Sequence, residues 1–151
     1  LTAQARHVGG AEFEYFDRWA ERLTNEVNAD ALAAHMVSRS LAGRPSLVKA
    51  LREWARSPQR LRRRAAAMAF TPLVREGRFL TDALSVAELL MEDADEVVRQ
   101  GVAALLVDAS RLQAERVAEF LEEWRERSPE ALLRAAAAKL RPDQRARVLG
   151  E

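Results

Sequence analysis

The feature that most constrains the fold is a repeat with a period of about 35 residues. Three stretches that combine an arginine with apolar and small residues align at offsets of 36 and 35 residues, and they span residues 62–66, 98–102 and 133–137. We predict that each stretch opens the second helix of a helix pair. Units of this kind cannot bury their apolar faces alone, so they stack on one another. The sequence therefore predicts an all-α fold of stacked antiparallel helix pairs.

Composition agrees with a helical fold and excludes several classes of site. Alanine, the best helix former, supplies 29 of the 151 residues, whereas aromatic residues, which favour strands, make up 6%. Because the chain has no cysteine, disulfides and thiolate metal sites are excluded. A chain of this length buries about two-thirds of its unfolded surface, which suffices for a core. We therefore expect a single domain over residues 1–151, with no metal site and no cofactor.

Apolar residues at helical spacing, interrupted by polar or proline-marked joints, locate the helices. Ser46 is the predicted N-cap of the third helix, and Ser57 that of the fourth, with Pro58 at its first helical position. Pro72 is expected to bend the fourth helix or end it early. The predicted helices span residues 11–23 and 28–41, a third after 46, a fourth from 57 to about 75, and then 80–91, 95–109, 113–126, 129–140 and 142–149.

The formal net charge of +1 conceals two strongly polarised segments. Residues 44–78 carry ten basic and two acidic side chains, a balance of +8, whereas residues 79–126 carry four basic and twelve acidic ones, a balance of −8. No stretch approaches the roughly 18 apolar residues of a membrane span, and no signal-peptide pattern is present. We expect no membrane association and a cytoplasmic location. A chain that begins on Leu1 rather than Met is also expected to be trimmed or partial.

Arginines gather at the start of the predicted fourth helix. Four of them within five positions repel one another unless an anion lies near, and a phosphate backbone is such an anion, because arginine offers it two donors at once. The alternative is a structural arginine: Arg63 aligns with Arg99 and Arg134, which predicts a repeated pairing with a nearby aspartate. The candidate DNA-binding residues are Arg56, Arg60, Arg62, Arg63 and Arg64.

Several short motifs then occur in a recognisable order. The stretch 93–102 resembles the signature of HEAT-type repeats. The stretches 16–23 and 30–33, the stretch 54–60 followed by 63–66, and the pairs Leu133-Arg134 and Lys139-Leu140 are similar to motifs of the DNA alkylation repair family. The resemblance covers about residues 12–149 and corresponds to the C-terminal two-thirds of a typical member, so part of the family's N-terminal repeats is expected to be lacking.

This resemblance implies a right-handed HEAT-like solenoid whose concave basic face holds duplex DNA. Active members of the family are glycosylases that excise N3- and N7-alkylated purines. Asp30 falls on the family's catalytic aspartate, where it would stabilise positive charge developing on the deoxyribose and position the attacking water. A lone aspartate near a helix start also has a purely structural interpretation, because it favours the helix dipole.

The chain departs from the family at its tryptophans. Where the family has aromatic residues against the DNA and the cationic base, this sequence has Glu26, Leu61, and Ala104 or its immediate neighbour, and the usual Leu-Arg-Glu appears as 106–108. A cation–π contact contributes about 0.5–2 kcal/mol. We therefore expect base excision to be weakened or lost, and DNA binding to be the better-supported activity.

The alternative function is a protein-interaction scaffold, because HEAT-type solenoids also bind proteins. It is favoured if the arginine cluster lies on the convex surface or is covered by the acidic helices that follow residue 79. The tryptophans Trp19, Trp54 and Trp124 lie on apolar stripes and are predicted core residues, and His7 and His35 lack metal-ligand spacing. The glutamates of one predicted helix form a solvated acidic surface: Glu119, Glu122, Glu123 and Glu126.

Overall fold

The computed structural model describes residues 17–20 and 22–151, and every element in that part of the chain is helical. Most of the predicted helix 11–23, and His7, lie outside the described residues. The elements are α2 (Glu26–Ala31), the π-helical η2 (Leu32–Val37), α3 (Ser38–Gly43), the 3-10 turn η3 (Pro45–Leu47), α4 (Val48–Ala55), α5 (Arg60–Met68), α6 (Thr71–Arg75), α7 (Leu80–Glu88), α8 (Glu96–Trp124), α9 (Glu130–Ala136) and α10 (Pro142–Leu149).

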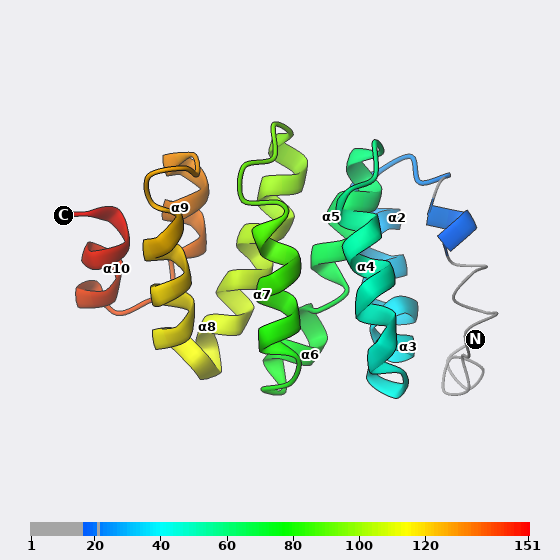
Figure 1. Cartoon of the computed structure of the whole chain (residues 1–151), viewed down its shortest axis with the longest axis horizontal. Helices are drawn as coiled ribbons and strands as arrows, with labels where there is room; N and C mark the ends of the chain where they lie inside the picture. The colour runs from blue at the N-terminus through cyan, green and yellow to red at the C-terminus, as the bar shows by residue number, and fades with distance from the viewer. Residues whose placement is uncertain (1–16, 21) are drawn as a thin grey trace.

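The helices follow one another along the long axis of the molecule from the N-terminal to the C-terminal end (Figure 1). In this view α4 and α7 lie in front, with α2, α5, α6 and the first part of α8 behind them. Helix α5 packs on α4 within its own pair, and also on α2 and on α8. The prediction of an all-α fold is therefore confirmed for the described residues, and α5 packs against helices that precede and follow it in the chain.

The predicted breaks between helices are confirmed at two positions. Gln113 has non-helical backbone angles, φ −134° and ψ 53°, inside α8, and the chain turns back there (Figure 1). Pro72 lies in the first turn of α6, after α5 has ended at Met68. The predicted helix 28–41 is present but continues to Gly43 and has a π-helical middle, which apolar spacing does not reveal.

Two predicted caps are wrong. Ser46 lies in η3 and makes no capping hydrogen bond, because α4 starts only at Val48. Ser57 and Pro58 precede α5 by a turn, since the helix begins at Arg60. The Ser57 hydroxyl instead accepts a hydrogen bond from the Gln59 backbone N–H at 3.1 Å. A tight turn therefore occupies the place where the helix was expected to start.

The core contains both small alanines and large aromatic side chains. Ala65, Ala66 and Ala67 of α5 are fully buried, so neighbouring helices approach α5 closely. Trp54 and Trp124 are buried, as predicted. The prediction is wrong for Trp19, which is 52% exposed and borders an open pocket of about 450 Å³ beside α2 and η2. Helix α2, which lines this pocket, also packs against α5.

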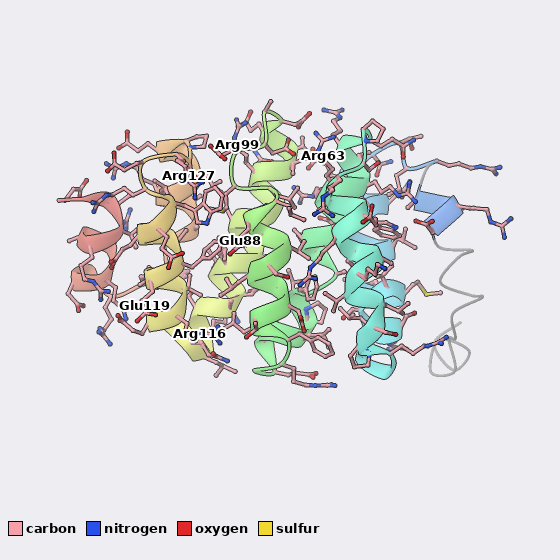
Figure 2. All side chains as sticks on the ribbon, viewed as in Figure 1. Arg63, Glu88, Arg99, Arg116, Glu119 and Arg127 are labelled. Carbon is pink, nitrogen blue, oxygen red and sulfur yellow. The ribbon has the colours of Figure 1, made fainter. Side chains whose placement is uncertain are left out.

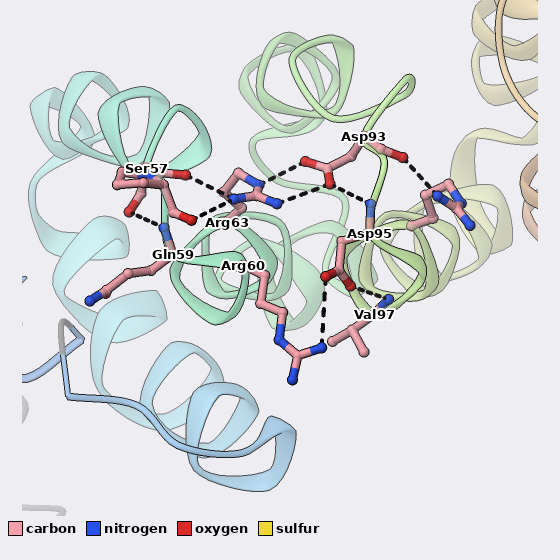
Figure 3. Close-up of polar contacts among 9 residues, drawn as sticks. Ser57, Gln59, Arg60, Arg63, Asp93, Asp95 and Val97 are labelled. Atoms are coloured by element: carbon pink, nitrogen blue, oxygen red, sulfur yellow. Dashed lines mark hydrogen bonds and ion pairs between the residues drawn. The ribbon is translucent and has the colours of Figure 1, made fainter.

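One contact recurs with the period of the repeat. The Arg63 guanidinium donates to the Ser57 carbonyl at 3.0 Å, and the Arg99 guanidinium donates to the Asp93 carbonyl at 2.8 Å, in each case six residues back (Figure 3). Both arginines thereby close the turn that precedes their own helix. Arg134, the third aligned arginine, instead pairs with Glu130 at 2.7 Å and Glu151 at 2.9 Å. The contact of the arginine with the carbonyl six residues before it is therefore present in two of the three aligned stretches.

The C-terminal helix α10 is attached through a polar contact. The buried Gln144 side chain donates to the Glu115 carboxylate at 3.0 Å, and Arg147 donates to the same carboxylate at 2.9 Å. These hydrogen bonds, the one from Gln144 first, lower the pKa of Glu115 from its ordinary value of 4.5. The ionised form of Glu115 is therefore the one that contributes to the attachment of α10, beside the Arg147–Glu122 ion pair and the buried Val148.

We expect the attachment of α10 to depend on pH in the acidic range. Because folding lowers the pKa of Glu115, its contribution is complete above pH 4.5 and is lost as the pH falls through the lowered value. Protection factors for amide hydrogen exchange in α10, which correct for the intrinsic pH dependence of exchange, should fall below pH 4.5 in the wild type, whereas Glu115→Gln should show lower protection factors that do not change with pH in this range. Equal pH dependence in both proteins would contradict this role.

Candidate nucleic-acid interface

The arginines at the start of α5 pair with different carboxylates of this chain, and Figure 3 shows two of these pairs, Arg60 with Asp95 and Arg63 with Asp93. Because these carboxylates come from several elements, the repulsion within the cluster is relieved inside the protein, without an external anion. The pairs are Arg60 with Asp95, Arg62 with Asp17, Arg63 with Asp93, and Arg64 with Asp30. The arginines predicted as one cluster therefore occupy neighbouring positions on α5, but their guanidinium groups pair with different carboxylates.

Arg64 makes the most complete set of contacts. Its Nε donates to Asp30 Oδ1 at 2.8 Å, its Nη2 donates to Asp30 Oδ2 at 2.9 Å, and its Nη1 donates to the Val97 carbonyl at 2.8 Å. Only 8% of the residue is exposed. The hydrogen bonds to Asp30 raise the pKa of the guanidinium against the opposing effect of burial, and the Asp30 and Glu26 charges add to the increase. Arg64 is a fixed cation that joins α2, α5 and α8.

Asp30 is the candidate catalytic carboxylate, and it remains partly accessible. Its side chain keeps 31% of its surface exposed although both oxygens accept from Arg64. A carboxylate oxygen has lone pairs for further donors, so a ligand or a water can still approach it. The bidentate pair fixes the orientation of the carboxylate and balances its charge.

Arg63 is the structural arginine that the repeat alignment predicts as an alternative. Its Nε donates to Asp93 Oδ2 at 2.8 Å and its Nη2 to Asp93 Oδ1 at 3.1 Å, in a bidentate pair. Asp93 also accepts from the Asp95 backbone N–H at 3.0 Å (Figure 3). The predicted pairing of Arg63 with a nearby aspartate is therefore confirmed, and the pair ties the turn before α5 to the turn before α8.

Arg62 faces a different part of the molecule. It donates to the Asp17 carboxylate and to the Asp17 backbone carbonyl, and its guanidinium carbon lies 5.6 Å from the centre of the Trp54 ring. The indole N–H of Trp54 donates to the same Asp17 carboxylate. With 15% of its side chain exposed, Arg62 is an internal contact between α5, α4 and the segment before α2.

Arg56 and Arg60 differ from the other three in exposure. Their side chains are 56% and 59% exposed, and their ion pairs are long, at 3.5 Å to Glu53 and 3.7 Å to Asp95. Pairs of this kind are weak, so both guanidiniums can turn toward another anion. Figure 3 shows Arg60 extending beside Val97, the residue whose carbonyl Arg64 contacts. Arg56 and Arg60 are hereafter called the exposed arginines.

Three positions departing from the family's aromatic pattern have separate environments. Leu61 is buried in the core with 6% exposure, Ala104 is half-buried in α8, and Glu26 is exposed one turn before Asp30 in α2. Glu26 therefore adds negative charge beside the Asp30–Arg64 pair, consistent with its effect on the Arg64 pKa. Among the described residues, no three His, Asp or Glu side chains come together as metal ligands.

Sequence reasoning missed two residues of this site, Val97 and Gly101. The Val97 carbonyl binds Arg64, and a backbone acceptor leaves no mark in a residue pattern. Gly101 lies in the interior of α8 directly beside Arg64, and a glycine in a long helical pattern is a signal that could have been noticed.

A family model described as DNA alkylation repair enzyme matches residues 1–140. The chain belongs to this family. Comparison with curated proteins and with solved structures gave no significant match. In the described part of the chain, no helix has both the length and the apolar character that crossing a membrane requires. Membership of the DNA alkylation repair family relates the chain to DNA repair and suggests DNA as its partner.

We expect Arg64 and Arg60 to differ sharply in their contribution to stability. Arg64→Met should lower the free energy of unfolding by about 2–4 kcal/mol, because it leaves the partly buried Asp30 carboxylate without its cation. Arg60→Met, the same change one helical turn earlier, should cost less than about 1 kcal/mol because its pair is long and exposed. Urea unfolding of both variants measures the difference, and equal losses would mean that the Asp30–Arg64 pair has no special role.

Proposed function

We propose that this member of the family is a HEAT-like, right-handed helical-repeat protein that binds duplex DNA, with residues 1–151 forming a single domain. The observation that carries the proposal is an exposed arginine, Arg60, that lies on the same helix as the residue that holds the partly exposed Asp30. Arg60 and Arg64 are one turn apart on α5, and Arg64 holds Asp30. A phosphate bound by Arg60 would therefore bring the adjoining nucleotide toward the Asp30 carboxylate.

The contacts divide the five candidate residues into two groups. Arg62, Arg63 and Arg64 are held by carboxylates of the chain, so they support the surface rather than meet the phosphates. Arg56 and Arg60 supply the phosphate contacts, because their own ion pairs are weak and a phosphate accepts two hydrogen bonds from a guanidinium. Two contacts predict a modest salt dependence, with a slope of about −0.9 for each phosphate neutralised.

Base excision is the less supported part of the proposal. Asp30 is oriented and accessible, which suits a carboxylate that stabilises positive charge on a deoxyribose. Its charge is balanced by Arg64, and the family's aromatic positions hold Glu26, Leu61 and Ala104. Glu26 can attract a cationic base but also repels a phosphate. DNA binding is therefore the better-supported part of the proposal, and any excision of bases is expected to be slow.

Reversing the charge of the exposed arginines should weaken DNA binding. Arg56→Glu combined with Arg60→Glu is expected to reduce the affinity for a short duplex about tenfold or more at low salt, because two phosphate contacts become repulsive. The slope of log affinity against log salt should fall in magnitude by about 2. Fluorescence anisotropy over a salt series measures both quantities.

The matched control carries the same charge change elsewhere. Arg116→Glu combined with Arg145→Glu alters two exposed arginines, one in the second part of α8 and one in α10. This control should keep most of the affinity and the wild-type salt slope. If both double variants lose affinity equally, net charge and not the proposed surface determines binding.

Excision tests the role of Asp30. With protein in excess over a duplex containing alkylated purines, release of 7-methylguanine or 3-methyladenine should be slow in the wild type. Asp30→Asn should reduce the rate at least about 100-fold, because it removes the charge that stabilises the sugar cation. Chromatography of the released bases measures the rate. A protein that binds DNA but releases no base would reduce the proposal to binding.

A protein-interaction scaffold is the second candidate, and one surface favours it. A groove of about 310 Å³ runs between α7 and the second part of α8, with Leu84 and Phe120 among its lining residues. Glu88, Glu119 and Glu123 also line it, together with a single cation, Arg116 (Figure 2). An acidic groove with apolar residues suits a basic amphipathic segment of another protein. Binding of such a segment without measurable DNA affinity would favour this candidate.

A further inference from the structure

Gly101 lies where a glycine is unfavourable in itself. It lies six residues into α8, in a regular helical turn, and an alanine there would stabilise an isolated helix. A Cβ atom added at this position would lie 2.9 Å from Arg64 Cγ and 3.7 Å from both Arg64 Cδ and Nη1. All three nearest atoms belong to one arginine. The missing side chain therefore leaves a slot on α8 that Arg64 fills.

The slot leads Arg64 to both of its partners. From Gly101 the arginine crosses one helical turn of α8 to the Val97 carbonyl, to which Nη1 donates at 2.8 Å. Nε and Nη2 on the other edge of the guanidinium donate to Asp30 of α2 at 2.8 and 2.9 Å. A carbonyl has two lone pairs, so Val97 can accept from Arg64 while keeping its bond within the helix. The arginine thus lies flat against α8 and faces α2.

We infer that Gly101 is a positioning residue of the candidate site, acting on Asp30 through Arg64. The 2.9 Å contact is at Cγ, close to the backbone of Arg64. A movement of the guanidinium end alone would therefore not relieve the collision. A Cβ there forces Arg64 into another rotamer, and a changed rotamer moves the guanidinium away from Asp30 and Val97. The effect of this displacement on catalysis rests on the proposed function; the displacement itself does not.

Another glycine of the chain provides the comparison. Gly43 is the last residue of α3 and has nothing within 4 Å of an added Cβ. Gly43→Ala is therefore the same chemical change without a neighbour. The contrast separates two effects of the substitution, the gain in helix propensity and the collision with Arg64.

A double-mutant cycle tests the slot. In the wild-type background, Gly101→Ala should lower the urea midpoint, whereas Gly43→Ala should leave it unchanged or raise it. In the Arg64→Ala background, Gly101→Ala should raise the midpoint, because the colliding Cγ is gone and only the better helix propensity remains. This reversal of sign is the expected result. A midpoint raised by Gly101→Ala in both backgrounds, or lowered in both, overturns the inference.

A second measurement holds even if Arg64→Ala does not fold. In ¹⁵N-edited spectra the Arg64 Nε–H, held by Asp30, should be visible and slow to exchange in the wild type, and Asp30→Asn assigns it. Gly101→Ala should lose this signal while the backbone spectrum is kept. A signal that persists in Gly101→Ala overturns the inference, whatever the protein does to DNA.

The catalytic consequence is measured separately. If the wild type excises alkylated purines, Gly101→Ala should lower the single-turnover rate about tenfold or more, because the carboxylate is no longer oriented, and should leave duplex affinity within about twofold. An unchanged rate limits Gly101 to a structural role and overturns its assignment to the site. Absence of excision in the wild type is a failure of the proposed catalysis, and the cycle and the spectra then decide the inference by themselves.

Discussion

The interaction on which the structure depends is the pairing of the α5 guanidiniums with carboxylates from other elements. Four arginines in five positions would repel one another on an isolated helix. In the folded chain each of these arginines pairs with its own aspartate, and the four aspartates are Asp17, Asp30, Asp93 and Asp95. Three of these pairs are short and largely buried on the arginine side, so removing one partner leaves the other uncompensated. For this reason α5 is joined to its neighbouring helices by ion pairs as well as by apolar contacts.

The same pairing limits what the cluster can bind. An arginine that holds a carboxylate of the chain cannot leave it for a phosphate without leaving that carboxylate unpaired near the approaching anion. Of the five candidate arginines, Arg56 and Arg60 are the two whose charge an external anion can readily reach. The surface beside Asp30 thus has an oriented carboxylate, its fixed cation Arg64 and the accessible guanidinium of Arg60 one helical turn away.

Regular features of the fold could be predicted from sequence, and individual partners could not. The helix break at Gln113 and the pairing of Arg63 with an aspartate follow from periodicity, which depends only on the order of residues. The partner of Arg62 could not be foreseen, because Asp17 lies 45 positions away and meets it only after folding. The predicted burial of Trp19 failed for a related reason. An apolar stripe shows which side of a helix is favourable to bury, but whether that side is buried depends on the elements that pack beside it.

The polarised charge of the sequence takes on a different meaning in the folded chain. The +8 segment, residues 44–78, and the −8 segment, residues 79–126, are successive helix pairs that lie against each other. Ion pairs run across their boundary: Arg60 to Asp95, Arg63 to Asp93, and Arg75 to the buried Asp108 at 2.9 Å. Much of the basic charge that suggests a nucleic acid therefore serves the contact between repeats. Because a repeat boundary and a DNA surface can both require arginines, the charge of a segment cannot distinguish them. Exposure and ion-pair length separate the five candidate arginines more sharply, because only Arg56 and Arg60 among these five are exposed and held by long ion pairs.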